Sequence, residues 1–247
     1  MAESFTISLA GQTIRVAPLF DAVGAMCRDY LTETTEPNIS VVITPADIEA
    51  ERQYAEETRL REGQPLYEHS DAYLETLAVY RKIADAMFKR STLLFHGSAV
   101  ARDGEAYLFT ARSGTGKTTH TCLWLKQFPD AHVVNGDKPL LRIGSEGVSV
   151  CGTPWMGKEN YGCNEELPLK AICIIERAEQ NSIERIGFGE ALKTLLAQSY
   201  VPGDGSIMDT LTLLGKIKNV HYFRLHCNME PEAALVSYRG MQEEGIE

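Results

Sequence analysis

The sequence predicts an α/β fold in which a mixed sheet carries a glycine-rich loop, with a smaller α+β part before it. Two observations support this prediction. From residue 91 onward, short apolar runs typical of buried strands alternate with segments of helical periodicity. One of these strands also leads directly into a glycine-rich loop and then into a helix, an order typical of ligand-binding α/β domains.

Composition and charge exclude several classes of function. The 247 residues carry 24 Lys+Arg and 34 Asp+Glu, for a formal net charge of −10. A general nucleic-acid binder needs a basic surface, so we expect no nucleic-acid partner. No apolar run approaches the roughly 20 residues that span a bilayer, and residues 1–5 lack the basic-then-apolar order of a signal peptide, so we expect a cytoplasmic protein without a membrane partner.

The six cysteines are predicted to be reduced and structural. They form no CxxC pair and lack the histidine spacing of a zinc site. Several lie in apolar runs, where a thiol packs as a small hydrophobic group.

Residues 1–90 are predicted to form the α+β appendage. A strand, a turn at Ala10–Gly11 and a returning strand make a hairpin, and Thr44 precedes Pro45 as the N-cap of a helix. The expected elements are strands over 5–9, 13–16 and 40–43, a solvated helix to Arg61, and an amphipathic helix over 71–89.

Residues 91–247 are predicted to form the main domain. Its expected strands are 92–95, 106–110, the central strands 132–134 and 170–175, and a late strand over 221–225. Its expected helices cover 117–128, 204–217 and 231–241, and a turn is expected at Arg102–Glu105.

The sharpest motif is Ala111–Thr119, which matches GxxxxGK[ST] except that alanine replaces the first glycine. Glycines at 114 and 116 let backbone N–H groups surround a phosphate, and the following helix presents its positive end to the same anion. This pattern predicts a P-loop that binds a nucleoside triphosphate and Mg²⁺, although a glycine-rich turn without function can match the same pattern by chance. The expected nucleotide-binding residues are Arg112, Ser113, Gly114, Thr115, Gly116, Lys117, Thr118 and Thr119. Lys117 would contact the β/γ-phosphates, and the Thr118 hydroxyl would bind the metal.

An acid follows the next predicted strand. Asp137 comes after His132–Val134 and a glycine, at a strand end where α/β sheets bind ligands. Its position suits a metal ligand or a base that accepts a proton. The alternative is a turn-capping aspartate paired with Lys138.

The segments His96–Val100, Ser113–Thr119 and Asn135–Pro139 together resemble the superfamily of HPr kinase/phosphorylase and ATP-type phosphoenolpyruvate carboxykinase. The resemblance covers about residues 90–175 and is greatest to small HPr-kinase-related bacterial proteins. It implies a P-loop core of that type with ATP and Mg²⁺, an aspartate base and a histidine near the transferred phosphate. These roles fall on Lys117, Thr118, Asp137 and His96; without the resemblance, a lone histidine at a strand end such as His96 is more often a structural residue.

Two departures from the family are visible. The family shows two adjacent acids where this chain has Gly136–Asp137, so only Asp137 is carried over. The HPr-kinase signature after this acid is replaced by Cys151–Asn160, so HPr itself is not the expected acceptor. The loop over 152–164, with Lys158, is either an acceptor loop or an ordinary surface loop. Arg177, at the end of a strand, is either an arginine finger on the phosphoryl group or a partner in a salt bridge.

The sequence therefore predicts a kinase that transfers the γ-phosphoryl of ATP to a serine-type hydroxyl of a peptide, small protein or small molecule. The expected catalytic residues are Asp137, Lys117, His96 and Arg177, with Thr118 and Asp137 at the metal. Alternatives are a non-catalytic ATP-binding regulatory module, which Gly136 favours, a carboxykinase-like enzyme, and an ATPase or GTPase switch. Phosphorylase activity stays open, and the resemblance also implies a homo-oligomer.

Overall fold

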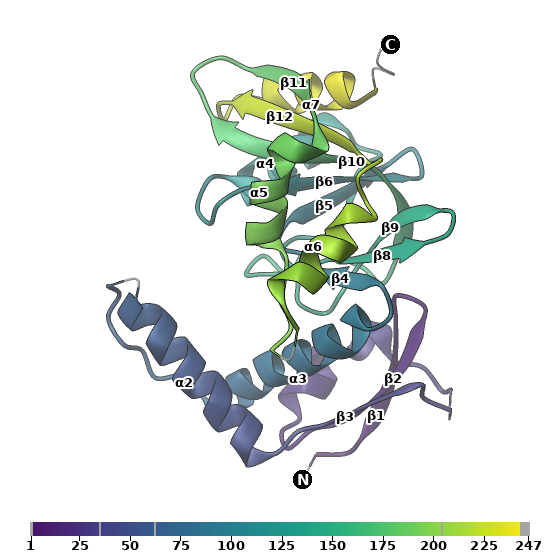
Figure 1. Cartoon of the computed structure of the whole chain (residues 1–247), viewed down its shortest axis with the longest axis vertical. Helices are drawn as coiled ribbons and strands as arrows, with labels where there is room; N and C mark the ends of the chain where they lie inside the picture. The colour runs from purple at the N-terminus through teal and green to yellow at the C-terminus, as the bar shows by residue number, and fades with distance from the viewer. Residues whose placement is uncertain (1, 35, 62, 204, 243–247) are drawn as a thin grey trace. The chain divides into compact units, whose positions relative to one another are not determined.

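The computed structural model describes residues 2–34, 36–61, 63–203 and 205–242. The chain divides into two compact units, Met1–Ala86 and Met87–Glu247, and the boundary lies within the helix α3 (Asp71–Phe88) (Figure 1). None of the described helices is both long and apolar enough to cross a membrane.

The first unit is a small sheet with helices. Strands β1 (Phe5–Leu9) and β2 (Gln12–Ala17) form an antiparallel hairpin, and β3 (Ile39–Val42) pairs in parallel with β2. The hairpin turns where Ala10 and Gly11 both have positive φ, 48° and 70°, a backbone that suits a two-residue turn. The helical elements are α1 (Ala22–Met26), the 3₁₀ turn η1 (Arg28–Tyr30), α2 (Pro45–Arg61) and the first part of α3.

The second unit contains a nine-stranded mixed sheet in its described residues. Its strands are β4 (Thr92–Leu94), β5 (Ser98–Arg102), β6 (Glu105–Thr110), β7 (His132–Asn135), β8 (Leu140–Gly144), β9 (Gly147–Cys151), β10 (Glu166–Arg177), β11 (Ser182–Ile186) and β12 (His221–Cys227). Seven follow the order β4-β8-β9-β10-β6-β5-β7, and β12 pairs with both β10 and β11. Strand β10 connects the antiparallel strands β4, β8 and β9 to the rest of the sheet. Its start pairs with β9, and its later part pairs in parallel with β6 and β12.

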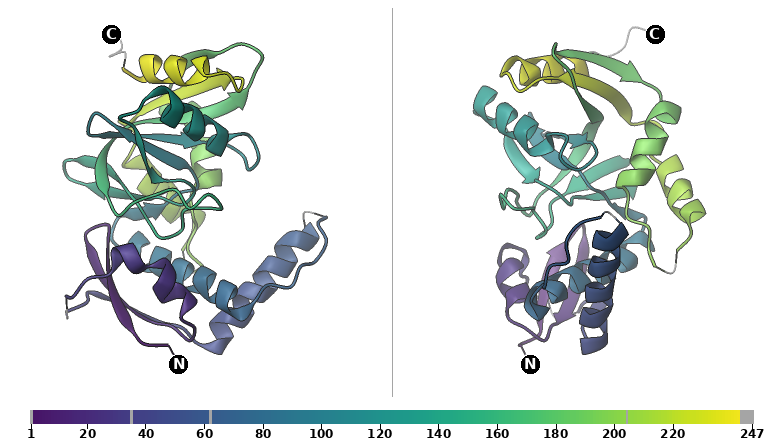
Figure 2. Two further views of the ribbon diagram at one scale, coloured as in Figure 1. Left: turned by 180° about the vertical axis from the view of Figure 1, so that it is seen from behind. Right: turned by 90° about the vertical axis from the view of Figure 1, so that its left-hand side faces the viewer.

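Helices cover both faces of this sheet (Figure 2). One core packs around α4 (Lys117–Gln127) and α7 (Glu232–Gln242), and the other around α5 (Phe188–Gln198) and α6 (Ile207–Gly215). Side chains of β10 alternate between them: Cys173 and Ile175 belong to the first core, and Ile172 and Ile174 to the second. A strand with helices on both faces needs apolar residues at every position, which explains the unbroken apolar run.

The order of strands brings four strand ends to one edge of the sheet. Strands β10 and β12 are parallel to β6. Because β5 is antiparallel to both β6 and β7, β7 also runs in the direction of β6. The carboxyl ends of β6, β7, β10 and β12 therefore share an edge, where α/β sheets bind ligands.

Several expected elements need correction. Strand β7 was expected to be central, but it lies at the end of the strand order and, among the strands that the structure describes, pairs only with β5. Strands β5, β8, β9 and β11 and helices α1 and α5 were not expected from the sequence; β8, β9 and β11 are each only five residues long and include exposed positions, so their apolar pattern is short. The late helix begins at Ile207, and Asp204, its expected start, lies outside the described residues.

Candidate functional site

The glycine-rich loop lies between β6 and α4 and has an open backbone. Gly114 and Gly116 have φ of 76° and 126°, values that L side chains rarely adopt. A Cβ atom built on either glycine meets no atom within 4 Å. The space beside both residues is therefore free, and the loop can surround an anion with its N–H groups.

The loop ends at the N-terminus of α4, where no side chain competes for the first N–H groups. The N-cap residue is Gly116, which has no side chain to accept a hydrogen bond. The next residue, Lys117, is buried, and its Nζ donates a hydrogen bond to the Ala111 carbonyl oxygen at 3.1 Å. Burial lowers the pKa of Lys117, and the nearby Asp137 carboxylate partly opposes this effect. A buried ammonium beside uncapped N–H groups makes this end of α4 strongly attractive to phosphate.

Asp137 follows β7 and is held by hydrogen bonds from its own loop. The side-chain oxygen of the fully buried Asn135 accepts hydrogen bonds from the backbone N–H of Asp137 at 2.9 Å and of Lys138 at 2.6 Å. The Asn135 amide in turn donates to the backbone and hydroxyl oxygens of Thr153, each at 3.0 Å. This network connects the end of β7 to the segment after β9 and fixes the backbone of Asp137 and Lys138.

The Asp137 carboxylate contacts two basic side chains. His96 Nε2 lies 3.2 Å from Oδ1, and Lys138 Nζ donates to Oδ2 at 2.9 Å. Burial alone would raise the pKa of Asp137, but the His96 hydrogen bond and the Lys138 charge outweigh it and hold this pKa at about 2. Asp137 is therefore an ionised carboxylate at neutral pH, so it can accept a proton or bind a cation.

A cavity of about 420 Å³ brings most of the expected residues together. Those that line it are His96, Ser113, Gly114, Gly116, Lys117, Thr118, Thr119 and Asp137. Three further lining residues come from the loop after β9, namely Gly157, Lys158 and Glu159. This part of the loop is exposed and also borders the cavity, so Lys158 stays a candidate contact for an acceptor.

Glu159 is the site residue that sequence reasoning missed. A Cβ built on Gly157 would lie 3.7 Å from Asp137 Cγ and 4.0 Å from Glu159 Oε2, so the two carboxyl groups flank the same point. The residues around Glu159 match no recognisable motif, and only the fold of the loop places this acid near Asp137. The cavity thus has two carboxyl groups although the chain lacks a pair of adjacent acids.

The same loop explains why residue 136 is glycine. A Cβ at this position would lie 2.8 Å from the Met156 carbonyl oxygen and 3.2 Å from that of Tyr161. Gly136 N also donates to Tyr161 O at 2.9 Å. The loop over 156–161 therefore passes where the side chain of a second acid would begin.

Arg177 and Arg112 lie outside this cavity. The Arg177 guanidinium donates hydrogen bonds to the carbonyl oxygens of Thr115, at 2.9 Å, and Gly114. It pairs with the loop backbone rather than with a neighbouring acid, so the expected salt bridge is not the contact that the structure shows. Arg112 is exposed and, with Arg177, lines an adjoining hollow that shares Ser113 and Gly114 with the cavity.

An apolar cavity of about 410 Å³ also borders the loop and shares Gly116 and Thr119 with the first cavity. Thr115, Gly116 and Thr119 line it from the loop and α4, and Ile175, Cys227 and Met229 line it from the ends of β10 and β12. Arg177 and His120 also line it, and burial lowers the pKa of His120 to about 4, so its imidazole is neutral. Sequence reasoning missed this cavity because its walls come from strands far apart in the chain.

Comparisons with known proteins give similarities to solved structures. No family model matches the chain. No curated protein matches its sequence. The fold is similar to the Hpr(Ser) kinase/phosphatase from Coxiella burnetii with a TM-score of 0.36 and 9% sequence identity, over 60% of this chain and 89% of that chain.

Proposed function

We propose that this protein is an ATP-dependent phosphotransferase that moves the γ-phosphoryl group of ATP to a hydroxyl acceptor. The observation that carries this proposal is that Lys117 and Asp137 line the same cavity, together with Gly114 and Gly116 of the glycine-rich loop. The loop and Lys117 bind phosphate, and a carboxylate lies on the other side of the same space. Phosphoryl transfer requires such positioning and charge stabilisation more than any covalent chemistry by the protein.

The residues present fit ATP and Mg²⁺. The space beside Gly114 and Gly116, where a Cβ would meet nothing, is the cradle that a polyphosphate needs. Oxygen ligands suit Mg²⁺, and the Thr118 hydroxyl with the carboxylates of Asp137 and Glu159 provides them in one cavity. When bound, the metal ion neutralises phosphate charge and orients the phosphoryl group for in-line transfer.

The side chains of the chain itself supply three further effects. Lys117 exchanges its hydrogen bond to Ala111 for a phosphate oxygen and places a positive charge where negative charge spreads during transfer. Asp137 accepts the proton that the acceptor hydroxyl releases as its oxygen attacks the phosphoryl group. His96 and Lys138 orient the Asp137 carboxylate, and Arg177 holds the loop through two carbonyl groups.

The apolar cavity is the proposed site of the nucleobase. It shares Gly116 and Thr119 with the phosphate cavity, so one ligand can occupy both. Its lining from Ile175, Cys227 and Met229 offers the apolar contact that a purine ring requires. The acceptor then approaches from the side of Lys158 and Glu159.

A second candidate function is an ATP-binding regulatory module without transfer activity. The observation that favours it is the low pKa of Asp137, about 2, which makes this carboxylate a weak base while His96 and Lys138 remain bound to it. In that case ATP binding would order the loop and signal through its new conformation.

Calorimetry with ATP, with and without Mg²⁺, tests the nucleotide site. We expect Lys117→Ala to weaken Mg²⁺-dependent binding at least about tenfold, which is about 1.4 kcal/mol. Lys126→Ala, at the exposed far end of the same helix, is the matched control and should bind as the wild type does. Equal affinity of wild type and Lys117→Ala, or no binding by the wild type, contradicts the proposal.

Turnover separates the two candidate functions. We expect Asp137→Asn to bind ATP within a few-fold of the wild type while transfer or slow hydrolysis of ATP falls about 10²-fold or more. If the wild type binds ATP but its turnover equals that of Asp137→Asn, with water or with an acceptor, the regulatory module is the better description.

A further inference from the structure

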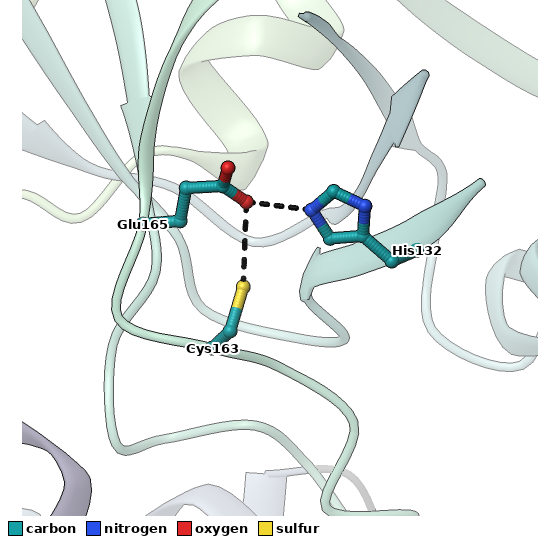
Figure 3. A group of neighbouring side chains, drawn as sticks. All are labelled: His132, Cys163 and Glu165. Atoms are coloured by element: carbon teal, nitrogen blue, oxygen red, sulfur yellow. Dashed lines mark hydrogen bonds and ion pairs between the residues drawn. The ribbon is translucent and has the colours of Figure 1, made fainter. Parts of the chain in front are cut away.

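Three metal-ligating side chains meet at the opposite end of β7 from Asp137 (Figure 3). His132 begins β7, and Cys163 and Glu165 lie on the segment that leads into β10. The Nε2 atom of His132 lies 2.6 Å from Glu165 Oε2, and Cys163 Sγ lies 3.6 Å from the same oxygen. All three ligand atoms lie within 4.8 Å of one another.

The local backbone explains this convergence. Asn135 forms an antiparallel bridge with Gly162, and Cys163 N donates to Val134 O at 3.1 Å. Continuing this register places Glu165 opposite His132, and Cys163 two residues earlier points to the same face. The spacing is thus set by strand pairing rather than by a local sequence motif.

The segment is also held tightly in place. Gly152 N donates to Glu165 O at 2.9 Å, and a Cβ built on Gly152 would lie only 1.8 Å from the Cys163 carbonyl oxygen. Only glycine at position 152 permits this approach. The backbone that carries two of the three ligands is therefore fixed before any ligand binds.

We propose that His132, Cys163 and Glu165 form a binding site for a zinc-class divalent cation, separate from the nucleotide site. An imidazole, a thiolate and a carboxylate are the ligand types that Zn²⁺ prefers. Tetrahedral coordination with Zn–ligand distances of 2.0–2.3 Å separates ligand atoms by about 3.3–3.6 Å. The Cys163–Glu165 contact already has this length, and the His132–Glu165 contact lengthens by about 0.7 Å when the metal replaces the hydrogen bond.

Metal binding requires the thiolate form of Cys163, so this thiol loses its proton to solvent. His132 binds the metal through Nε2, the atom that faces Glu165. The two anionic ligands balance the charge of the cation. The side chains of His132 and Glu165 are 52% and 37% exposed, which leaves a fourth position for water.

The metal would connect β7 to the end of the loop that carries Gly157, Lys158 and Glu159. Because this loop lines the candidate site, the cation would restrict the mobility of the acceptor side of the cavity. The site itself does not depend on the proposed phosphotransferase function.

Titration of the full-length reduced protein with Co²⁺ tests the site, since a thiolate ligand produces a sulfur-to-cobalt charge-transfer band. We expect one equivalent of Co²⁺ to produce this band and Zn²⁺ to abolish it by displacement. Cys163→Ser should remove the band, and His132→Gln and Glu165→Gln should weaken Co²⁺ binding at least about tenfold. Cys122→Ser, which changes the other partly exposed cysteine, is the matched control and should keep the band.

Two further measurements keep the outcome unambiguous. Asp137→Asn should keep the cobalt band, because the nucleotide site supplies no thiolate. Zn²⁺ should also slow alkylation of Cys163 in the wild type at least about tenfold, measured by mass spectrometry of the labelled peptide, whether or not any variant folds. An unchanged alkylation rate of Cys163, or a band that survives in Cys163→Ser, overturns the proposal.

Discussion

At the scale of single residues, the candidate site depends on the balance of forces on one carboxylate. Burial disfavours the charged form of Asp137, and His96 and Lys138 restore it. The carboxylate therefore stays ionised well below neutral pH, and its pairing contributes stability at any pH above the ordinary aspartate pKa of about 3.9. This contribution is lost as the pH falls from about 4 toward 2.

Replacing Lys138 should reveal this balance. In Lys138→Met one of the two stabilising groups is gone, so we expect the pKa of Asp137 to rise by about one unit or more. Since the variant carboxylate protonates at higher pH, the acid-induced loss of activity should move to higher pH as well. The measurement is the titration of the Asp137 carboxyl carbon by NMR. Lys170→Met, which removes a lysine paired with Glu105 instead, should leave it unchanged, and an unshifted titration in Lys138→Met would refute the assignment.

At the scale of secondary-structure elements, two features position the site: hydrogen bonds between α4 and α7, and the close approach of the loop after β9 to Gly136. Helix α4 is joined to α7 because Ser237 Oγ accepts from Trp124 Nε1 at 2.8 Å and contacts His120 Nε2 at 3.0 Å. This holds the N-terminus of α4 at the sheet edge. The loop after β9 reaches Asp137 because Gly136 leaves room for it.

Adding a methyl group at position 136 tests the second contact. In Gly136→Ala the Cβ would be too close to the carbonyl oxygens of Met156 and Tyr161, so the loop must move. We expect a loss of about 1–3 kcal/mol in the free energy of unfolding and weaker ATP binding. Gly144→Ala, whose Cβ would have its nearest contact at 3.8 Å, should change the free energy of unfolding by less than about 1 kcal/mol. Equal urea midpoints for the two variants would show that the loop is not constrained as described.

At the scale of the whole molecule, the residues assigned to ATP and to the cation all belong to the second unit, Met87–Glu247. The first unit has its own sheet and its own buried residues, including Ile7, Ile14 and Val41. A ligand should therefore stabilise one unit directly and leave the other unchanged.

Hydrogen exchange in the full chain measures this difference. At 100 times its dissociation constant, ATP–Mg²⁺ stabilises the unit that binds it by about 2.7 kcal/mol. We expect slower exchange of amides over 113–119 and 136–138, and unchanged exchange in β1–β3. Equal slowing in both units would mean that they open as one cooperative body.

The sequence by itself determined the α/β class, the strand–loop–helix order around residues 106–127, and the identities of Lys117 and Asp137 as candidates. These features are local, because they depend on the periodicity of neighbouring residues and on glycines within one short motif. Strand β7 was wrongly expected to be central. The order of strands depends on pairing between distant segments, and the residues of a single strand do not show which strands pair with it. The tertiary structure alone decided which residues meet. It placed Glu159 beside Asp137, engaged Arg177 with the loop backbone, and brought His132 to Cys163 and Glu165, because contacts across a sheet arise from register and close approach rather than from sequence spacing.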